Sequence, residues 1–456
     1  MAELETGRAE LRPDEVGQVT FLFSIKAIAV VLLAGFLLHL FLASLPGFGI
    51  DLGTFQAWSL RLADRGPWNF YDRGFFADYA PGYLYILWLI GGLNKVLAFD
   101  TGQFHYMLKL PAVFADLASA YLLYRMLAGQ RPLFRLGAPI LYLLFPATIL
   151  IGPVWGQIDS LLALFLLLSV YYISRGRPIE GSIAYVVGFV IKPQAIAALP
   201  FLAFWIMRQH PPRWAPAGAL WVKLPVPPRI WFYIIGAAFG VLLLLILPFF
   251  PDRPWNFYDQ LKHATEVYPY NSLNAYNFWG MFGFFKSDGI QHLGLADRYW
   301  GLILFGAATV GVIYVLRRSE GTGALALGAA LSTLAFYVFL TRMHERYMFP
   351  FFLPFLAACV LLQSRLLWGT FIVFGIVQFL DLYFVYSYYP LAFPAAGQAP
   401  QEPFFRPLYD LITHSDVLGL GLEAAKLLSI VTVATFLLLL LASYVLRLGF
   451  RRSAAI

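Results

Sequence analysis

The chain has 456 residues, of which 60% are hydrophobic and 12% are charged. Runs of about 20 apolar residues, the length that a helix needs to cross a bilayer, recur along it, so the sequence excludes a soluble globular protein and predicts an all-α polytopic membrane protein. The net charge of +7 comes from Lys and Arg spread over short loops, which indicates contact with lipid phosphates and not with nucleic acid.

The first half of the chain is predicted to cross the membrane with its basic loops on one side. Residues 21–45 form the first span, and because no basic n-region or cleavage site precedes it, we expect it to stay as an anchor. The apolar stretch 81–98 is interpreted as a helix at the interface, since a full span there would put neighbouring arginine loops on opposite sides. Three further spans follow, at 107–127, 136–152 and 160–174. Residues 183–207 are interrupted at Lys192-Pro193, which predicts a short in-and-out pair.

The second half continues this alternation. Six more spans are expected, at 231–250, 300–316, 324–340, 348–362, 367–388 and 422–446. With the broken segment this makes about ten to twelve transmembrane helices, with juxtamembrane helices in the first external loop. Opposite to the basic loops lie the external loops 46–106 and 251–298. A third external stretch, 390–420, has the composition of a surface loop with little chemistry.

One short motif occurs twice. Trp-Asn-Phe-Tyr-Asp stands at 68–72 and again at 255–259, each time after a proline and in an external loop. Five residues do not indicate a duplicated half, as in transporters with inverted repeats. We interpret the motif as a shared turn with an anchoring side chain.

The first candidate for chemistry is Asp51, which follows the first span. Gly47 and Gly49 allow a sharp backbone turn before it. A carboxylate held there is able to accept a proton from a hydroxyl group, the task of a general base. A helix cap exposed to solvent is the simpler interpretation.

Acidic and aromatic residues meet at other external positions. Asp78-Tyr79-Ala80-Pro81 places an acid before a proline that begins a helix, and Trp155-Gly156-Gln157-Ile158-Asp159 precedes another span, so both acids are also candidate caps. A cluster of amides and rings suits a hydroxyl-rich ligand such as a sugar. It contains Tyr268, Tyr270, Asn271, Asn274, Tyr276, Asn277 and Trp279.

The most concentrated polar group is Arg342-Met343-His344-Glu345-Arg346-Tyr347, between two apolar runs. Two arginines and a histidine suit a phosphate, because a guanidinium offers a planar fork to its oxygens. A salt-bridge cluster at the interface is the alternative. Lys192 either reaches the same cavity or extends to the membrane surface. Met348 rules out a His-Glu-x-x-His zinc motif, and we expect no metal, no nucleotide loop and, with Cys359 alone, no intrachain disulfide.

In chain order these motifs resemble the membrane glycosyltransferases of the GT-C superfamily, especially bacterial enzymes that use polyprenyl-phosphate sugars and are related to mannosyl- and glucosyltransferases. The resemblance covers residues 1–365, which we expect to be the catalytic module, while 366–456 add C-terminal transmembrane helices and no separate soluble domain is expected. It rests on Asp51, Asp78-Tyr79-Ala80-Pro81, Trp155 to Ser160, Lys192-Pro193-Gln194, Asn274 to Trp279 and His344-Glu345-Arg346-Tyr347.

The resemblance implies an inverting transfer of a mannose- or glucose-like sugar from a polyprenyl-phosphate donor to a glycolipid or glycan acceptor. It implies no cofactor and no required metal, and a site on the extracytoplasmic face of the bacterial cytoplasmic membrane. Asp51 would be the base, with Asp78 as the second candidate because Ala80 stands where many relatives carry proline and Asp51 has no acidic neighbour. Arg342, His344, Arg346 and Lys192 would hold the donor phosphate. The substrate-binding residues would be Tyr79, Trp155, Gln157, Asp159, Asn274, Tyr276, Asn277, Trp279 and Glu345.

Two alternatives remain open from the sequence. A glycan ligase or polymerase with a lipid-diphosphate donor would depend on the arginines and histidine of the later loop, with Asp51 dispensable. A transporter or flippase for a lipid-linked sugar would also need arginines for a phosphate, but it would be expected to have pseudo-symmetric halves and polar sites near the middle of the membrane.

Overall fold

The computed structural model describes residues 13–72, 74–217, 220–393, 400–413 and 423–446. Eight helices in this part of the chain are long and apolar enough to cross a membrane, which confirms an all-α, integral, multi-pass membrane protein. They are α1 (Pro13–Ala43), α4 (Thr101–Met126), α10 (Arg229–Ile246), α12 (Asp297–Leu316), α13 (Gly321–Phe339), η5 (Glu345–Phe351) continued by α14 (Phe352–Leu362), α15 (Arg365–Ala392) and α17 (Ala424–Val445).

Two of the predicted full spans differ from this set. The span expected at 136–152 is a pair, α5 (Pro132–Leu144) and α6 (Pro146–Ile149) continued by the π-helical segment η2 (Leu150–Trp155), with a bend of 45°. Pro146 explains the bend, since proline interrupts helix hydrogen bonding. The span at 160–174 is α7 (Asp159–Ser174), whose 16 residues are too short to cross the hydrocarbon core upright.

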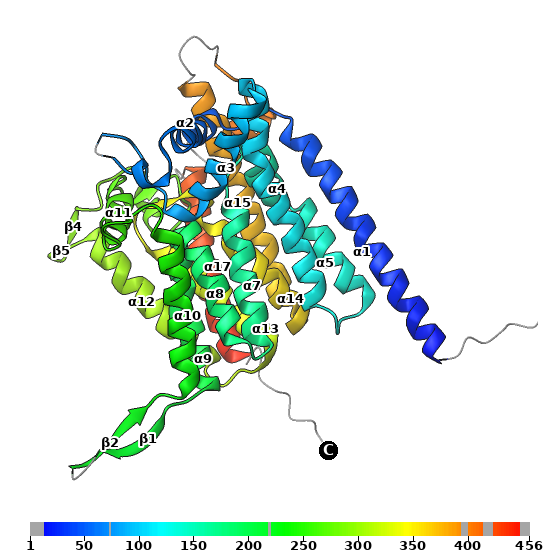
Figure 1. The fold of residues 1–456 in the computed structure, drawn as a ribbon, viewed down its shortest axis with the longest axis vertical. Coiled ribbons are helices and arrows are strands. Elements are labelled where there is room, and N and C mark those ends of the chain that lie inside the picture. The colour runs from blue at the N-terminus through cyan, green and yellow to red at the C-terminus, as the bar shows by residue number, and fades with distance from the viewer. Residues whose placement is uncertain (1–12, 73, 218–219, 394–399, 414–422, 447–456) are drawn as a thin grey trace, which may run out of the picture.

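The break at Lys192-Pro193 is confirmed. α8 (Pro178–Ile191) ends where Lys192 adopts an extended conformation, and η3 (Pro193–Ala198) and α9 (Leu199–Gln209) follow. A hairpin of β1 (Arg213–Ala217) and β2 (Leu220–Val226) then leads into α10. In Figure 1 this hairpin extends from the end of the bundle opposite to α2.

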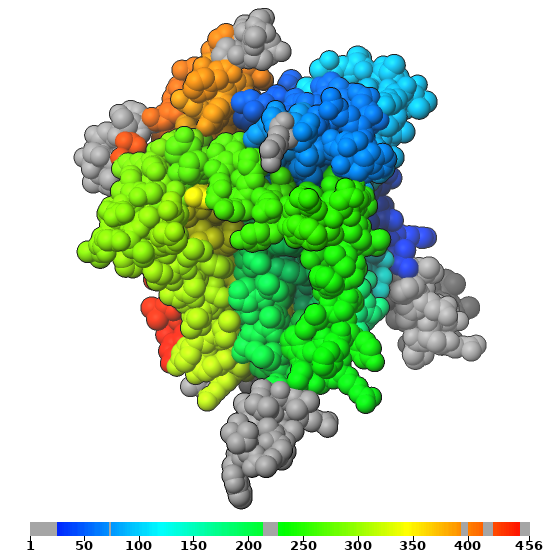
Figure 2. Space-filling model, turned by 60° about the vertical axis from the view of Figure 1, so that its left-hand side comes forward, coloured from blue at the N-terminus to red at the C-terminus, as the bar shows by residue number. Residues whose placement is uncertain are grey.

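The first external loop folds into helices. These are α2 (Gly49–Arg65), the 3-10 turn η1 (Pro67–Asn69) and α3 (Pro81–Leu97), and α3 is not among the helices long and apolar enough to span a membrane. The second external loop contains α11 (Asn256–Glu266), η4 (Trp279–Phe282) and three two-residue strands, and a fourth short strand follows α13. β3 (Ser272–Leu273) pairs in parallel with β6 (Met343–His344), and β4 (Gln291–His292) pairs with β5 (Leu295–Ala296). Figure 2 shows both loops covering the same end of the bundle.

The repeated Trp-Asn-Phe-Tyr-Asp motif forms two different structures. The first copy lies in η1 and the bend after it, whereas the second forms the start of α11. Phe70 and Phe257 are both buried in one aromatic cluster between the two loops, where they contact Phe249 and Phe250 respectively. The phenylalanine is therefore the shared anchor.

The bundle is centred on α13, which is buried from Gly323 to Phe339. α1 lies along its outer edge (Figure 1). Beyond α15, the stretch predicted as a surface loop contains α16 (Arg406–Ile412), and residues 401–404 line a cavity. Residues 394–399 and 414–422 of that stretch lie outside the described residues.

Candidate active site

Asp51 lies in the first turn of α2 and is half-buried. Its Oδ2 accepts hydrogen bonds from Trp155 Nε1 at 2.7 Å and from Gln157 Nε2 at 2.5 Å. The start of a helix favours a negative charge. Within the described chain no hydrogen bond is recorded to Oδ1, so this oxygen is available to a substrate hydroxyl.

The two donors to Asp51 come from the last residue of η2, Trp155, and from the turn that joins η2 to α7. Gly156 makes this turn with φ of +96°, a conformation that favours glycine, and its neighbour Gln157 donates its backbone N–H to Ile151 O at 2.9 Å. The Gln157 amide has a second partner, because its Oε1 accepts from the Tyr79 hydroxyl at 3.1 Å. The amide is thereby oriented by an acceptor on one side and a donor on the other.

Asp78 and Tyr79 reach this site from the strand-like segment before α3. The Tyr71 hydroxyl holds that segment by donating to Tyr79 O at 2.7 Å. Burial raises the pKa of Asp78 above its ordinary value, and the positive charges of Arg346 and Lys192 act against this rise. The two candidate bases thus differ in environment: donors from η2 and the turn after it orient Asp51, whereas Asp78 lies under the influence of nearby cations.

A buried ion pair lies beside them. Lys192 Nζ is 2.6 Å from Asp159 Oδ1, and both side chains are less than a tenth exposed. Lys192 is placed by the break between α8 and η3, and Asp159 by the start of α7. Lys192 Nζ also lies 5.1 Å from the ring centre of Tyr347, close enough for a cation–π contact. The lysine therefore stays inside the site and does not extend to the membrane surface.

Arg346 is the second cation of the site. Its Nη1 pairs with Glu345 Oε1 at 2.7 Å, while its buried Nε has no hydrogen-bond partner among the described residues. Gln378 holds the backbone by donating to Glu345 O at 3.0 Å. An N–H donor left free in a buried cation is suited to an anionic ligand, because an unpaired donor there is otherwise costly.

His344 is enclosed by aromatic rings. Its ring centre lies 5.3 Å from that of Tyr268 and 5.2 Å from that of Tyr347. Burial lowers the pKa of His344 well below its ordinary value, and the positive charges of Arg346 and Lys192 lower it further. His344 is therefore neutral near pH 7 and offers hydrogen bonds but no charge.

Arg342 has a different environment from the other predicted phosphate ligands. Its Nε pairs with the buried Asp288 Oδ2 at 2.6 Å, and its Nη1 donates to Thr265 O at 2.8 Å. Its backbone has φ of +65°, and its N–H donates to Tyr270 O. The side chain is thus engaged with the second external loop and is not in contact with Arg346.

The predicted amide and aromatic cluster divides in two. Asn277 uses its whole amide within the protein, with Nδ2 donating to Tyr337 O and Leu340 O and Oδ1 accepting from Trp279 N and Gly280 N. Trp279 Nε1 donates to Phe339 O, so it too shapes the loop. The backbone of Asn274 forms an isolated β-bridge with that of His344, so Asn274 is closer to the charged residues of the site.

Sequence reasoning missed the residues behind this loop. Asp381 of α15 is fully buried, and its Oδ2 accepts from Tyr276 N at 3.2 Å and from the Tyr337 hydroxyl at 2.9 Å. Gln378, one turn earlier, holds the Glu345 backbone. A signal was present, since an acid within a long apolar helix is costly and marks a polar contact.

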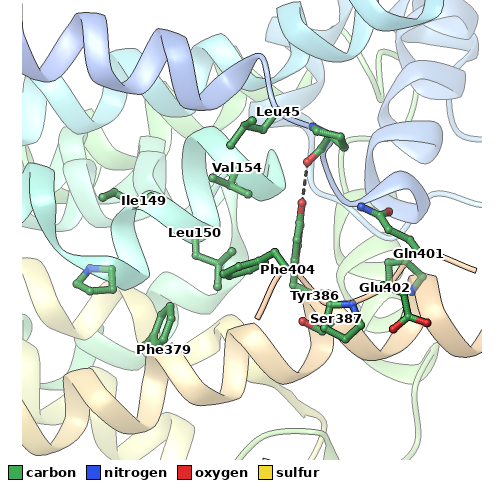
Figure 3. A pocket seen from close by; sticks show the side chains of 14 residues that line it. Leu45, Ile149, Leu150, Val154, Phe379, Tyr386, Ser387, Gln401, Glu402 and Phe404 are labelled. Atoms are coloured by element: carbon green, nitrogen blue, oxygen red, sulfur yellow. Dashed lines mark hydrogen bonds between the residues drawn. The ribbon is translucent and has the colours of Figure 1, made fainter. Parts of the chain in front are cut away.

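An apolar cavity of about 520 Å³ is lined by Val154, the residue before Trp155, and by Tyr386 (Figure 3). Tyr386 stands in its wall, 5.9 Å from the Trp155 ring centre, and its hydroxyl donates to Pro46 O at 2.6 Å. The other lining residues are Leu45, Pro46, Pro146, Ile149, Leu150, Val154, Phe379, Ser387, Pro390, Gln401, Glu402, Pro403 and Phe404. Throughout the described chain, no group of three His, Cys, Asp or Glu residues is arranged to hold a metal ion.

Comparisons with known proteins found similarity only to solved structures. No protein-family profile matches the chain, and no curated protein matches it. The chain is similar to the crystal structure of ArnT from Cupriavidus metallidurans bound to undecaprenyl phosphate, with 15% identity and a TM-score of 0.47 over 94% of this chain and 78% of that one. It is also similar to the structure of ArnT from Cupriavidus metallidurans in the apo state, with 13% identity and a TM-score of 0.49 over 95% of this chain and 78% of that one.

Proposed function

We propose that this protein is a membrane glycosyltransferase of the GT-C type. It transfers a mannose- or glucose-like hexose from a polyprenyl phosphate to a hydroxyl group of a glycolipid or glycan, on the extracytoplasmic face of a bacterial cytoplasmic membrane. One observation carries the proposal: Trp155 and Gln157 orient Asp51 through one oxygen, no described residue donates to the other oxygen, and the cations Arg346 and Lys192 lie within electrostatic reach.

The reaction follows from these charges. Asp51 Oδ1 accepts the proton of the acceptor hydroxyl as the hydroxyl oxygen forms a bond to the anomeric carbon. The bond between that carbon and the phosphate oxygen breaks on the opposite face, and its electron pair stays on the phosphate, so the configuration inverts. Arg346 and Lys192 stabilise the charge that grows on the departing polyprenyl phosphate.

The remaining residues serve binding. The neutral His344 and the Tyr79 and Tyr268 rings offer hydrogen bonds and flat faces to the sugar. The cavity lined by Val154 and Tyr386 receives part of an isoprenoid chain, since its lining is almost entirely apolar. Arg342 is left out of the donor site because Asp288 and Thr265 use its guanidinium.

The test is sugar transfer by purified protein in lipid nanodiscs, with a panel of synthetic polyprenyl-phosphate hexoses, with and without chelator. We expect turnover by the wild type, loss of at least about a hundredfold in Asp51→Asn, and no loss in the matched control Asp64→Asn, an exposed acid on the same helix. Full activity of Asp51→Asn with loss in Asp78→Asn would move the base to Asp78.

Two further outcomes separate the alternatives. The same assay is repeated with sugars on a lipid diphosphate, and turnover with these donors alone, together with an active Asp51→Asn, would indicate a ligase or polymerase. Binding of the lipid-linked sugar without any transfer, combined with its movement across a proteoliposome membrane, would indicate a transporter.

A further inference from the structure

A polar cluster lies inside the bundle, away from the site just described. His39 of α1, Asp116 of α4 and Tyr142 of α5 are all buried. The Tyr142 hydroxyl donates to Asp116 Oδ1 at 3.0 Å, and His39 Nε2 lies 2.9 Å from Leu143 O. Because a carbonyl only accepts, His39 Nε2 must carry a proton.

The contact between the other ring nitrogen of His39 and the second carboxylate oxygen of Asp116 requires a further proton. His39 Nδ1 is 3.4 Å from Asp116 Oδ2, and neither atom has another hydrogen-bond partner among the described residues. Two lone pairs facing each other in a buried site would repel, so this contact is favourable only with a proton between them. The cluster thus joins α1 to α4 by an ion pair or its neutral equivalent, as is expected of ionisable groups within a bundle.

The same face of α4 joins α1 a second time. Lys109 precedes Asp116 by seven residues, which is two helical turns and therefore the same side of the helix. Its buried Nζ donates to Ala43 O at 3.1 Å and to Leu45 O at 2.5 Å, the carbonyls at the end of α1. The lysine satisfies acceptors that the end of a helix leaves free.

The segment that bears the two donors to Asp51 packs against Lys109 and Asp116. A Cβ at Gly152 would lie 2.9 Å from Asp116 Oδ2, and one at Gly156 would lie 2.7 Å from Leu52 Cδ2 of α2 and 3.3 Å from Lys109 Cγ. The Gly156 N–H donates to Gly152 O at 2.9 Å, so the two glycines are also bonded to each other. On either side of Gly156 stand the two donors to Asp51.

We propose that His39, Lys109 and Asp116 are positioning residues for the transfer reaction. They fix η2 and the following turn against α4 at two points that lie two helical turns apart. In this way they determine where Trp155 and Gln157 hold the Asp51 carboxylate. The functional part of this inference rests on the proposed function; the structural part does not.

The structural part is tested by hydrogen–deuterium exchange of the protein in nanodiscs. In Asp116→Asn we expect the amides of Gly156 and Gln157 to exchange about tenfold faster or more, because their acceptors in η2 are no longer held. Lys109→Met gives the same direction if Asp116→Asn does not fold. Asp297→Asn is the matched control: it breaks another His–Asp contact, at 2.7 Å in the second external loop, and should leave these amides unchanged. Unchanged exchange in both variants overturns the proposal.

The functional part is tested by a double-mutant cycle. Asp116→Asn should lower kcat about tenfold with donor KM nearly constant, and in combination with Gln157→Ala it should add little to the loss caused by Gln157→Ala alone. Losses that multiply would show that Asp116 acts independently of Gln157, and the positioning role would be wrong. If the wild type transfers no sugar but exchange rises as expected, the proposed function fails and the positioning of the turn stands. If the wild type transfers sugar but exchange is unchanged in the variants, the proposed function stands and the positioning of the turn fails.

Discussion

Gln157 is the residue on which the orientation of the proposed base depends most directly. Its amide donates to Asp51 and accepts from Tyr79, so Gln157→Leu removes both bonds without adding charge. A hydrogen bond to a charged group contributes about 1.5–3 kcal/mol, and we therefore expect kcat to fall roughly 10- to 100-fold while donor KM changes little. Steady-state kinetics with a saturating acceptor measure both.

The matched control for this variant is Gln56→Leu. Gln56 lies on the same helix as Asp51, and its Oε1 is 3.1 Å from His105 Nε2. It loses a side-chain hydrogen bond of the same kind at a distance from the base. An equal loss of kcat in both variants would mean that α2 as a whole had moved, and the role given to Gln157 would be wrong.

His344 leads to a prediction on pH. Its lowered pKa means that the unfolded chain binds a proton below about pH 6.5 that the folded protein resists binding. This part of the stability is fully present above the ordinary histidine pKa and is lost as the pH falls from there towards the lowered value. His344→Gln should therefore show a smaller fall in thermal stability between pH 6.5 and pH 5 than the wild type.

The same variant tests the charge of the phosphate site. A histidine that is neutral near pH 7 provides no counter-charge, so donor KM at pH 7 should rise less in His344→Gln than in Arg346→Gln. His263→Gln, on the exposed side of α11, is the control for the stability curve. A donor KM with an inflection near pH 6.5 that disappears in His344→Gln would contradict a neutral His344.

Among the elements, the segment just before β6 is joined to the second external loop by the ion pair of Arg342 and Asp288. Asp288 is almost fully buried, and Arg342 is 23% exposed. Removing either side chain therefore leaves the charge of the other one poorly solvated and without this partner. We expect Arg342→Ala and Asp288→Asn each to cost roughly 2 kcal/mol of the free energy of unfolding, with losses in the double variant that are less than additive. Donor KM should stay near the wild-type value, whereas direct phosphate binding by Arg342 would raise it.

The elements also show how far the sequence alone leads. The lengths of the apolar runs predicted the helical class, and the proline after Lys192 predicted the break there, because both depend on local composition. The arginine loops predicted that residues 81–98 are not a full span, and α3 is indeed not among the helices long and apolar enough to cross a membrane. The bend before Pro146 was missed, since a proline inside an apolar run fits both a kinked span and a broken one. Likewise Arg342 and Arg346 are alike in sequence, and what separates them is the contact of Arg342 with Asp288, which is distant in the chain.

Across the whole molecule, the site joins segments far apart in the chain. Asp51 comes from the first external loop, its donors from the end of η2 and the turn after it, Lys192 from the broken helix pair and Arg346 from the start of η5. Each of these segments ends or breaks at the same end of the bundle, which is where polar groups can be solvated next to a membrane-embedded core. The apolar cavity adjoins these polar residues. An isoprenoid chain bound in the cavity would therefore place its phosphate near Lys192 and Arg346.

That arrangement leads to a prediction on the length of the donor's isoprenoid chain. Ile149→Trp should fill the cavity and displace the part of the isoprenoid chain that it holds. Loss of two buried CH₂ groups costs about 1.6 kcal/mol, or roughly tenfold in donor KM for a long-chain polyprenyl-phosphate sugar, with little effect on a short-chain analogue. Leu437→Trp on the exposed side of α17 is the matched control. Equal KM changes for long and short donors would exclude the cavity as the lipid site, because a tail that never enters it cannot distinguish the two lengths.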